Sequence, residues 1–169
     1  MERVAIRPVS LKDLERLVEL ANNRRISDNL TDDFPHPYTR EDGETFIESA
    51  SQQKPIHRFA ITADGKYVGN IGLHPQSDIY AKSAEIGYFV GEPYWGRGII
   101  SEAIRLIVKY GFEELDYIRI YAKVFEHNTP SMKALEKNGF VKEGVSRKAI
   151  VKNDVVMDDH QYAIINPNY

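Results

Sequence analysis

Apolar residues recur along the chain at two spacings, and each spacing predicts a different kind of element. Residues 4–7 alternate like a short strand, and the apolar positions after them recur at helical spacing. Ser10 and Asp13 form a capping pattern that is typical of a helix start. The sequence therefore predicts an amphipathic helix, with apolar positions at Leu11, Leu14, Leu17, Val18 and Ala21.

Residues 24–39 interrupt this regularity with two prolines and three aspartates, which predicts a long loop. Thr39 then starts a second short helix, whose apolar face carries Phe46, Ile47 and Ala50. Two strands follow over 57–63 and 66–74, and the Asp64-Gly65 pair between them is typical of a hairpin turn.

A further strand is predicted over 83–91, and after a glycine-rich stretch a helix runs to about residue 114. Residues 117–125 alternate again and predict a strand. A short helix follows, capped by Thr129 with Pro130 at its first position and ended by Asn138-Gly139.

The last pair of strands spans 145–152 and 155–165 and turns at Asn153-Asp154. The chain shows no linker, repeat or low-complexity segment. This order of strands and helices predicts one mixed α/β domain over residues 1–169.

Composition and charge exclude several classes of protein. The chain is 42% hydrophobic, which is enough for one core, and its net charge of −3 argues against a nucleic-acid partner. It has no polybasic run for a membrane surface, no apolar run of signal-peptide or membrane-span length, and no metal-ligand spacing among its five histidines. The absence of cysteine excludes disulfides and a cysteine nucleophile. We expect a cytoplasmic, metal-independent protein.

The stretch PYWGRGIISEA, residues 93–103, places two glycines around Arg97 where a helix begins. A helix N-terminus carries unpaired N–H groups and a partial positive charge, so it attracts anions. Glycines let the backbone approach a ligand closely. A simple glycine turn is the alternative interpretation of this stretch alone, which matches neither the P-loop nor the dinucleotide-binding pattern.

Two longer motifs, EIGYFVGEPYWGRGIISEAI and YAKVFEHNTPSMKALEKNGFVKEG, together resemble the GNAT superfamily of acyl-CoA N-acyltransferases. The closer likeness is to the branch that contains the ribosomal-protein N-terminal acetyltransferases RimJ and RimL. The resemblance covers residues 4–162. It implies the GNAT fold, a mixed and mostly antiparallel sheet flanked by helices, and acetyl-CoA as cosubstrate without a metal.

The family's acyl-CoA loop has the pattern Gln/Arg-x-x-Gly-x-Gly/Ala. Trp95 stands at its first position, Gly98 at the glycine, and Ile100, a departure, at the last small residue. Ile100 either narrows the loop or points into the core. The resemblance implies that backbone N–H groups hold the pyrophosphate of coenzyme A, at Gly96, Arg97, Gly98, Ile99, Ile100 and Ser101.

The resemblance also implies that the strand over 83–91 splays from its neighbour and offers backbone groups of Phe89 and Val90 to the pantetheine and the thioester. Amine acetylation needs a base, because an ordinary alkyl ammonium has a pKa of about 10. Glu85, in the same strand, is implied as the candidate base. A polar residue on a half-exposed strand is the alternative interpretation.

Asn128 matches the family's asparagine that binds the pantetheine arm, with an ordinary helix cap as the alternative. Many GNAT enzymes place a tyrosine in the following helix to protonate the leaving thiolate, but this helix has none. Ser131 fits the Asn-x-x-Ser pattern of the RimJ/RimL-like branch and is the candidate acid. A first-turn serine is also ordinary in a helix.

These motifs predict an N-acetyltransferase that moves an acetyl group to a primary amine by direct attack on the thioester. The acceptor is a protein N-terminus, a polyamine, an amino acid or an amino sugar. Loop residues Asp28, Asp32 and Asp33 could attract its ammonium or simply face solvent. The alternative function is a non-catalytic acyl-CoA-binding or regulatory module. A homodimer is compatible with the sequence, and neither nucleic acid nor membrane is expected as a partner.

Overall fold

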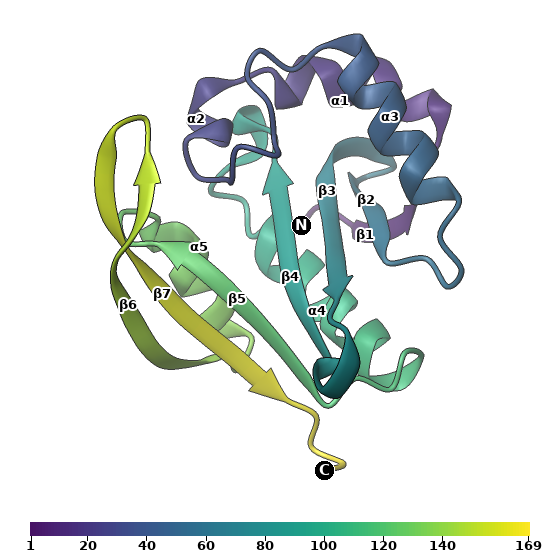
Figure 1. Cartoon of the computed structure of the whole chain (residues 1–169). Helices are drawn as coiled ribbons and strands as arrows, with labels where there is room; N and C mark the ends of the chain where they lie inside the picture. Colours follow the sequence, from purple (N-terminus) through teal and green to yellow (C-terminus); the bar gives the residue numbers. More distant parts are fainter.

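The alternating segments form one seven-stranded sheet with the strand order β1-β2-β3-β4-β5-β7-β6 (Figure 1). The computed structural model describes all residues, 1–169. Every neighbouring pair of strands is antiparallel except β4 and β5, which confirms the mixed, mostly antiparallel sheet. The strands are β1 (Val4–Pro8), β2 (Arg58–Ala63), β3 (Lys66–Pro75), β4 (Ser83–Val90), β5 (Arg119–Phe125), β6 (Val141–Lys152) and β7 (Val155–Ile165).

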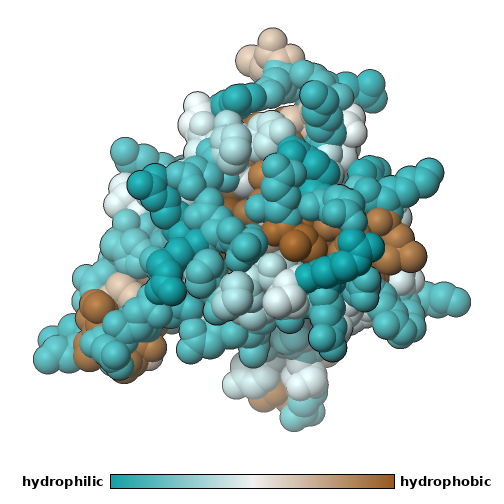
Figure 2. Space-filling model, turned by 90° about the horizontal axis from the view of Figure 1, so that it is seen from above, coloured by the Kyte–Doolittle hydropathy of each residue, from teal (hydrophilic) through white to brown (hydrophobic).

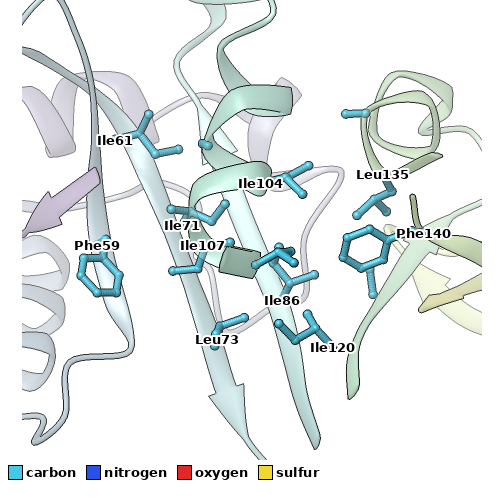
Figure 3. Close-up of a cluster of buried hydrophobic side chains, with 14 of the residues drawn as sticks. Phe59, Ile61, Ile71, Leu73, Ile86, Ile104, Ile107, Ile120, Leu135 and Phe140 are labelled. Atoms are coloured by element: carbon cyan, nitrogen blue, oxygen red, sulfur yellow. The ribbon is translucent and has the colours of Figure 1, made fainter. Parts of the chain in front are cut away.

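Helices cover both faces of the sheet, and each face has its own apolar core. One core lies beneath α1 and α3, and the other lies beneath α4 and α5. Figure 3 shows the second core, in which Ile104 and Ile107 of α4 meet the strand residue Ile86. Burying each such side chain contributes roughly 1.5–3 kcal/mol. The helices are α1 (Leu14–Ala21), α2 (Arg24–Ser27), α3 (Arg40–Ser51), α4 (Ile99–Glu113) and α5 (Thr129–Lys137).

The predicted turns and caps are largely confirmed. Asp13 accepts a hydrogen bond from the Ser10 N–H, as the capping pattern predicts. Asn153 and Asp154 both have positive φ, the backbone of a tight two-residue hairpin. At α5, however, the cap is Asn128 and not Thr129, which is the first helical residue.

Three further details differ from the sequence prediction. Leu11 lies in a 3₁₀ turn before α1 and is exposed, because that turn precedes the buried face of the helix. The predicted loop over 24–39 contains the four-residue helix α2, which Asn23 caps by accepting a hydrogen bond from the Arg25 N–H. Strand β6 begins at Val141, four residues earlier than predicted; its early residues are mostly exposed on an edge strand, so apolar alternation does not mark them.

Strands β4 and β5 pair for only three residues, over Ser83–Glu85 and Arg119–Tyr121. Beyond Glu85 the two strands diverge, while β4 stays paired to β3 as far as Val90 and β5 stays paired to β7 (Figure 1). The sheet is therefore open in its middle. This gap, which the resemblance implied, positions the site.

Candidate active site

A cavity of about 400 Å³ occupies the gap between β4 and β5. Its lining is mostly apolar, and its charged members are the cations Arg97 and Lys123, with no carboxylate. Such a lining suits an elongated ligand that carries negative charge. Ten of the twelve predicted site residues line it: Phe89, Val90, Trp95, Gly96, Arg97, Gly98, Ile99, Ile100, Asn128 and Ser131. Glu85 and Ser101 do not.

The two glycines of the predicted acyl-CoA loop have the backbone conformation that their residue type favours. Gly96 and Gly98 have φ of 75° and 76°, in the left-handed region. A Cβ added to either would meet no atom within 4 Å, so the space beside the loop is open. Gly98 is the N-cap of α4 and provides no side chain to satisfy the first N–H groups of the helix. These donors, with Arg97 beside them, fit the pyrophosphate of coenzyme A.

Trp95 and Arg97 each have a partner within the protein. The Trp95 indole N–H donates to the Val90 carbonyl oxygen at 2.7 Å and so ties the loop to the end of β4. Arg97 donates to Glu2 at 3.0 Å, and its guanidinium lies 5.3 Å from the centre of the Tyr94 ring. Its side chain remains 48% exposed, so water screens its charge.

The first residues of α4 divide between the cavity and the core. Ile99 is buried, whereas Ile100 is partly buried, packs against the core beneath α4 and also lines the cavity. Ile100 thus packs toward the core, which is the second of its two alternatives, and the first, that it narrows the loop, stays a prediction. Ser101 turns to α5, where its backbone and side-chain oxygens accept hydrogen bonds from the Asn138 amide.

The backbone carbonyl oxygens of Phe89 and Val90, near the end of β4, both lie close to other parts of the protein. The Phe89 carbonyl oxygen lies 2.1 Å from the position that a Cβ of Gly69 would take, so it faces β3. The Val90 carbonyl oxygen already accepts from Trp95. The Phe89 carbonyl oxygen thus faces β3, and one of the two lone pairs of the Val90 carbonyl oxygen is engaged. A role for backbone groups of these two residues toward pantetheine stays a prediction.

Glu85 lies at the last paired position of β4, where the gap begins. Alternation places Glu85 on the same strand face as Gly87, which lines the cavity. Gly87 has no side chain that could stand between Glu85 and the cavity. The Glu85 carboxylate belongs to none of the ion pairs of the protein. Burial and, after it, the charge of Glu85 raise the pKa of the Tyr121 hydroxyl on the neighbouring strand. An unpaired carboxylate thus stands at the base of the gap.

Asn128 and Ser131 reach the cavity from the other side, at the start of α5. Asn128 occupies the N-cap position, but its side chain makes no capping hydrogen bond, so its amide is available to a ligand. The Ser131 hydroxyl oxygen lies 2.5 Å from the Tyr88 hydroxyl oxygen. Burial raises the pKa of the Tyr88 hydroxyl to about 12, and its hydrogen bond with Ser131 opposes this increase.

Tyr88 is one of the cavity residues that the sequence motifs did not indicate. Strand alternation places it on one face with Ile86 and Val90, toward α4 and α5, and this was the available signal. Alternation alone could not show that β5 would diverge and let the phenol reach α5 across the gap.

Three polar contacts join the loop after α2 to the opposite side of the gap. Asn29, which lines the cavity, lies 2.6 Å from the His127 ring nitrogen Nε2. Lys152, at the β6–β7 turn, binds Asp32 at 2.7 Å, and Asn153 donates to Asp28 at 2.9 Å. Asp28 and Asp32 therefore face the β6–β7 turn and do not line the cavity. Seen from above, apolar surface lies among the hydrophilic side chains (Figure 2).

No group of three or more histidine, aspartate or glutamate side chains could hold a metal ion. None of the helices has the length and apolar character needed to cross a membrane.

Comparison with known proteins identifies the family. Residues 3–141 match the model of the acetyltransferase (GNAT) domain. The probable N-acetyltransferase YjcK of Bacillus subtilis is 35% identical, over 98% of this chain and 95% of that protein. The microcin C7 self-immunity acetyltransferase MccE, solved with acetyl-CoA and AMP, is 27% identical with a TM-score of 0.80, over 96% of this chain and 92% of MccE.

The likeness to the RimJ/RimL branch extends to three dimensions. Mycobacterium smegmatis RimJ, solved in complex with CoA-disulfide, has a TM-score of 0.84 and 24% identity, over 98% of this chain and 83% of RimJ. At that identity the comparison concerns the fold alone. The family model, which covers most of the chain, and YjcK, which matches nearly all of it, go further: the protein belongs to the GNAT family of acetyltransferases.

Proposed function

We propose that this protein is an N-acetyltransferase that moves the acetyl group of acetyl-CoA to the primary amine of a protein N-terminus or of a small molecule. The observation that carries the proposal is the gap between β4 and β5. The glycine loop lies at one end of the cavity in this gap. The unpaired carboxylate of Glu85 lies at the base of the gap, and Asn128 and Ser131 line the cavity from the α5 side. A donor that spans the cavity would bring its thioester between Glu85 and Ser131.

The loop and α5 bind the donor in this proposal. The N–H groups at the start of α4 hold the pyrophosphate, and the free Asn128 amide holds the pantetheine arm. The apolar lining excludes water along the arm, which strengthens the polar contacts near the thioester.

Glu85 takes the proton of the amine, directly or through one water. The nitrogen then attacks the carbonyl carbon, the C–S bond breaks with its electron pair going to sulfur, and the Ser131 hydroxyl protonates the sulfur. The bonded nitrogen loses its second proton to water as the amide forms, and water restores the proton that Ser131 gave. Holding the amine and the thioester in one cavity makes the reaction effectively unimolecular. The product amide carries no charge and therefore forms no ion pair with Glu85, so it can leave.

The experiment is a thiol-release assay with acetyl-CoA over a panel of amines. The panel contains peptide N-termini, polyamines, amino acids and amino sugars, each beside a form with its amine blocked. Release that requires a free amine supports the enzyme, and the preferred class identifies the acceptor. Binding of acetyl-CoA without release on any amine would favour the non-catalytic module instead.

Arg97→Ala should weaken acetyl-CoA binding by less than about tenfold, because a half-exposed cation contributes little through water. The affinity of the variant should also depend less on salt concentration. Calorimetric titration at two salt concentrations measures both effects. A loss of binding well beyond tenfold would mean that Arg97, and not the backbone, holds the pyrophosphate.

Ser131→Ala should lower turnover and leave acetyl-CoA affinity nearly unchanged, since the hydroxyl acts on the leaving sulfur. Steady-state rates beside calorimetric affinities separate the two effects. Turnover equal to that of the wild type would show that solvent or another group supplies the proton. The acetyl-transfer proposal would survive that result.

A further inference from the structure

Tyr88 and Ser131 form one hydrogen-bonded pair across the gap. Tyr88 belongs to β4 and Ser131 to α5, both side chains line the cavity, and their hydroxyl oxygens are 2.5 Å apart. The β4–β5 ladder ends three residues before Tyr88, so no strand lies between them. Helix α5 contains no tyrosine, but the Tyr88 phenol of β4 reaches it across the gap.

We propose that Tyr88 is a positioning residue that acts on the leaving thiolate through Ser131. This inference rests on the proposed function, in which Ser131 protonates the sulfur. A phenol is a stronger acid than an alcohol, so Tyr88 donates in this bond and the Ser131 oxygen accepts. A serine hydroxyl has one hydrogen. With its oxygen already engaged by Tyr88, that hydrogen points to the remaining acceptor, the sulfur.

The pair also gives up a proton more readily than a lone serine. As the C–S bond breaks, the Ser131 proton moves to sulfur and the Tyr88 proton follows to the Ser131 oxygen. The negative charge then rests on a phenolate, which is a weaker base than the alkoxide that an isolated serine would become. Water returns a proton to Tyr88 before the next turnover. With a pKa of about 12, the phenol is protonated at every pH at which the assay runs.

The test is Tyr88→Phe, which keeps the ring and removes the hydroxyl. Turnover should fall about tenfold, the value of one hydrogen bond, while calorimetric affinity for acetyl-CoA stays the same. The matched control is Tyr162→Phe. Tyr162 is a buried tyrosine whose hydroxyl also bonds α5, where it donates to Glu136 at 2.9 Å, but it does not line the cavity. The control should keep wild-type turnover.

Two readouts distinguish this role from simple packing. The solvent deuterium isotope effect on turnover should be smaller for Tyr88→Phe than for the wild type, because the variant has lost one of the two protons that move as the C–S bond breaks. Ser131→Ala should show the same trend. The double variant should be no slower than Ser131→Ala alone, since both hydroxyls act as one unit.

A Tyr88→Phe enzyme with wild-type turnover would overturn the inference, as would an unchanged solvent isotope effect or a deficit that multiplies with that of Ser131→Ala. Those results leave the proposed function intact, because the wild type still acetylates amines in the same assay. A wild type that acetylates no amine would instead overturn the proposed function and this inference with it.

Discussion

Glu85→Gln should lower turnover by about 10²- to 10⁴-fold, the usual contribution of a positioned general base. Glutamine keeps the size of the side chain and cannot accept the amine proton. Acetyl-CoA affinity should hardly change, because Glu85 lies outside the cavity lining, at the base of the gap. Rates over the amine panel beside calorimetry with acetyl-CoA measure both quantities.

The deficit of Glu85→Gln should shrink as pH rises. An alkyl ammonium has a pKa of about 10, so raising the pH supplies amine that is already deprotonated and needs no base. The matched control is Glu113→Gln, which removes an exposed carboxylate at the far end of α4 and should keep wild-type rates. Wild-type turnover of Glu85→Gln across neutral pH would remove Glu85 from the mechanism.

Gly98→Asp should abolish acetyl-CoA binding and leave the fold intact. Aspartate is one of the few residue types besides glycine that visit left-handed backbone, and its Cβ would enter open space. Its carboxylate would then stand where the pyrophosphate lies and repel it. Calorimetry with acetyl-CoA measures the loss, and circular dichroism verifies the fold.

Gly98→Asn is the control for this variant. Asparagine has nearly the same size and the same tolerance of left-handed backbone, so it adds bulk without charge. We expect it to bind acetyl-CoA more weakly than the wild type and more tightly than Gly98→Asp. A folded Gly98→Asp protein with unchanged affinity would mean that the pyrophosphate is bound elsewhere.

Most of the fold could be predicted from local patterns. The hairpin at Asp64-Gly65 and the cap at Ser10 depend on residues close in sequence, and both occur as predicted. The helix α2 could not be found in this way, because four residues carry no full period. The predicted N-cap of α5 was wrong by one residue, because Asn128 and Thr129 are both favourable N-cap residue types.

The candidate site was predictable only where it is continuous in sequence. The glycine loop is one short segment, and its left-handed glycines followed from residue type. The pairing of Tyr88 with Ser131 joins residues that are 43 positions apart and depends on where the β4–β5 ladder ends. The occupied Val90 carbonyl likewise depends on how Trp95 folds back, which no pattern specifies.

In mechanical terms, the sheet consists of two stiff plates, β1–β4 and β5–β7, that are joined along a strip three residues long. Helix α4 packs against β1, β3 and β4 and also against α5, so it braces the plates from one side. A molecule in the cavity touches both plates and acts as a second brace. Because it binds the assembled form, it also stabilises that form against unfolding. Without the donor, the two plates lack this second brace, so they move relative to each other more easily than when the donor is bound.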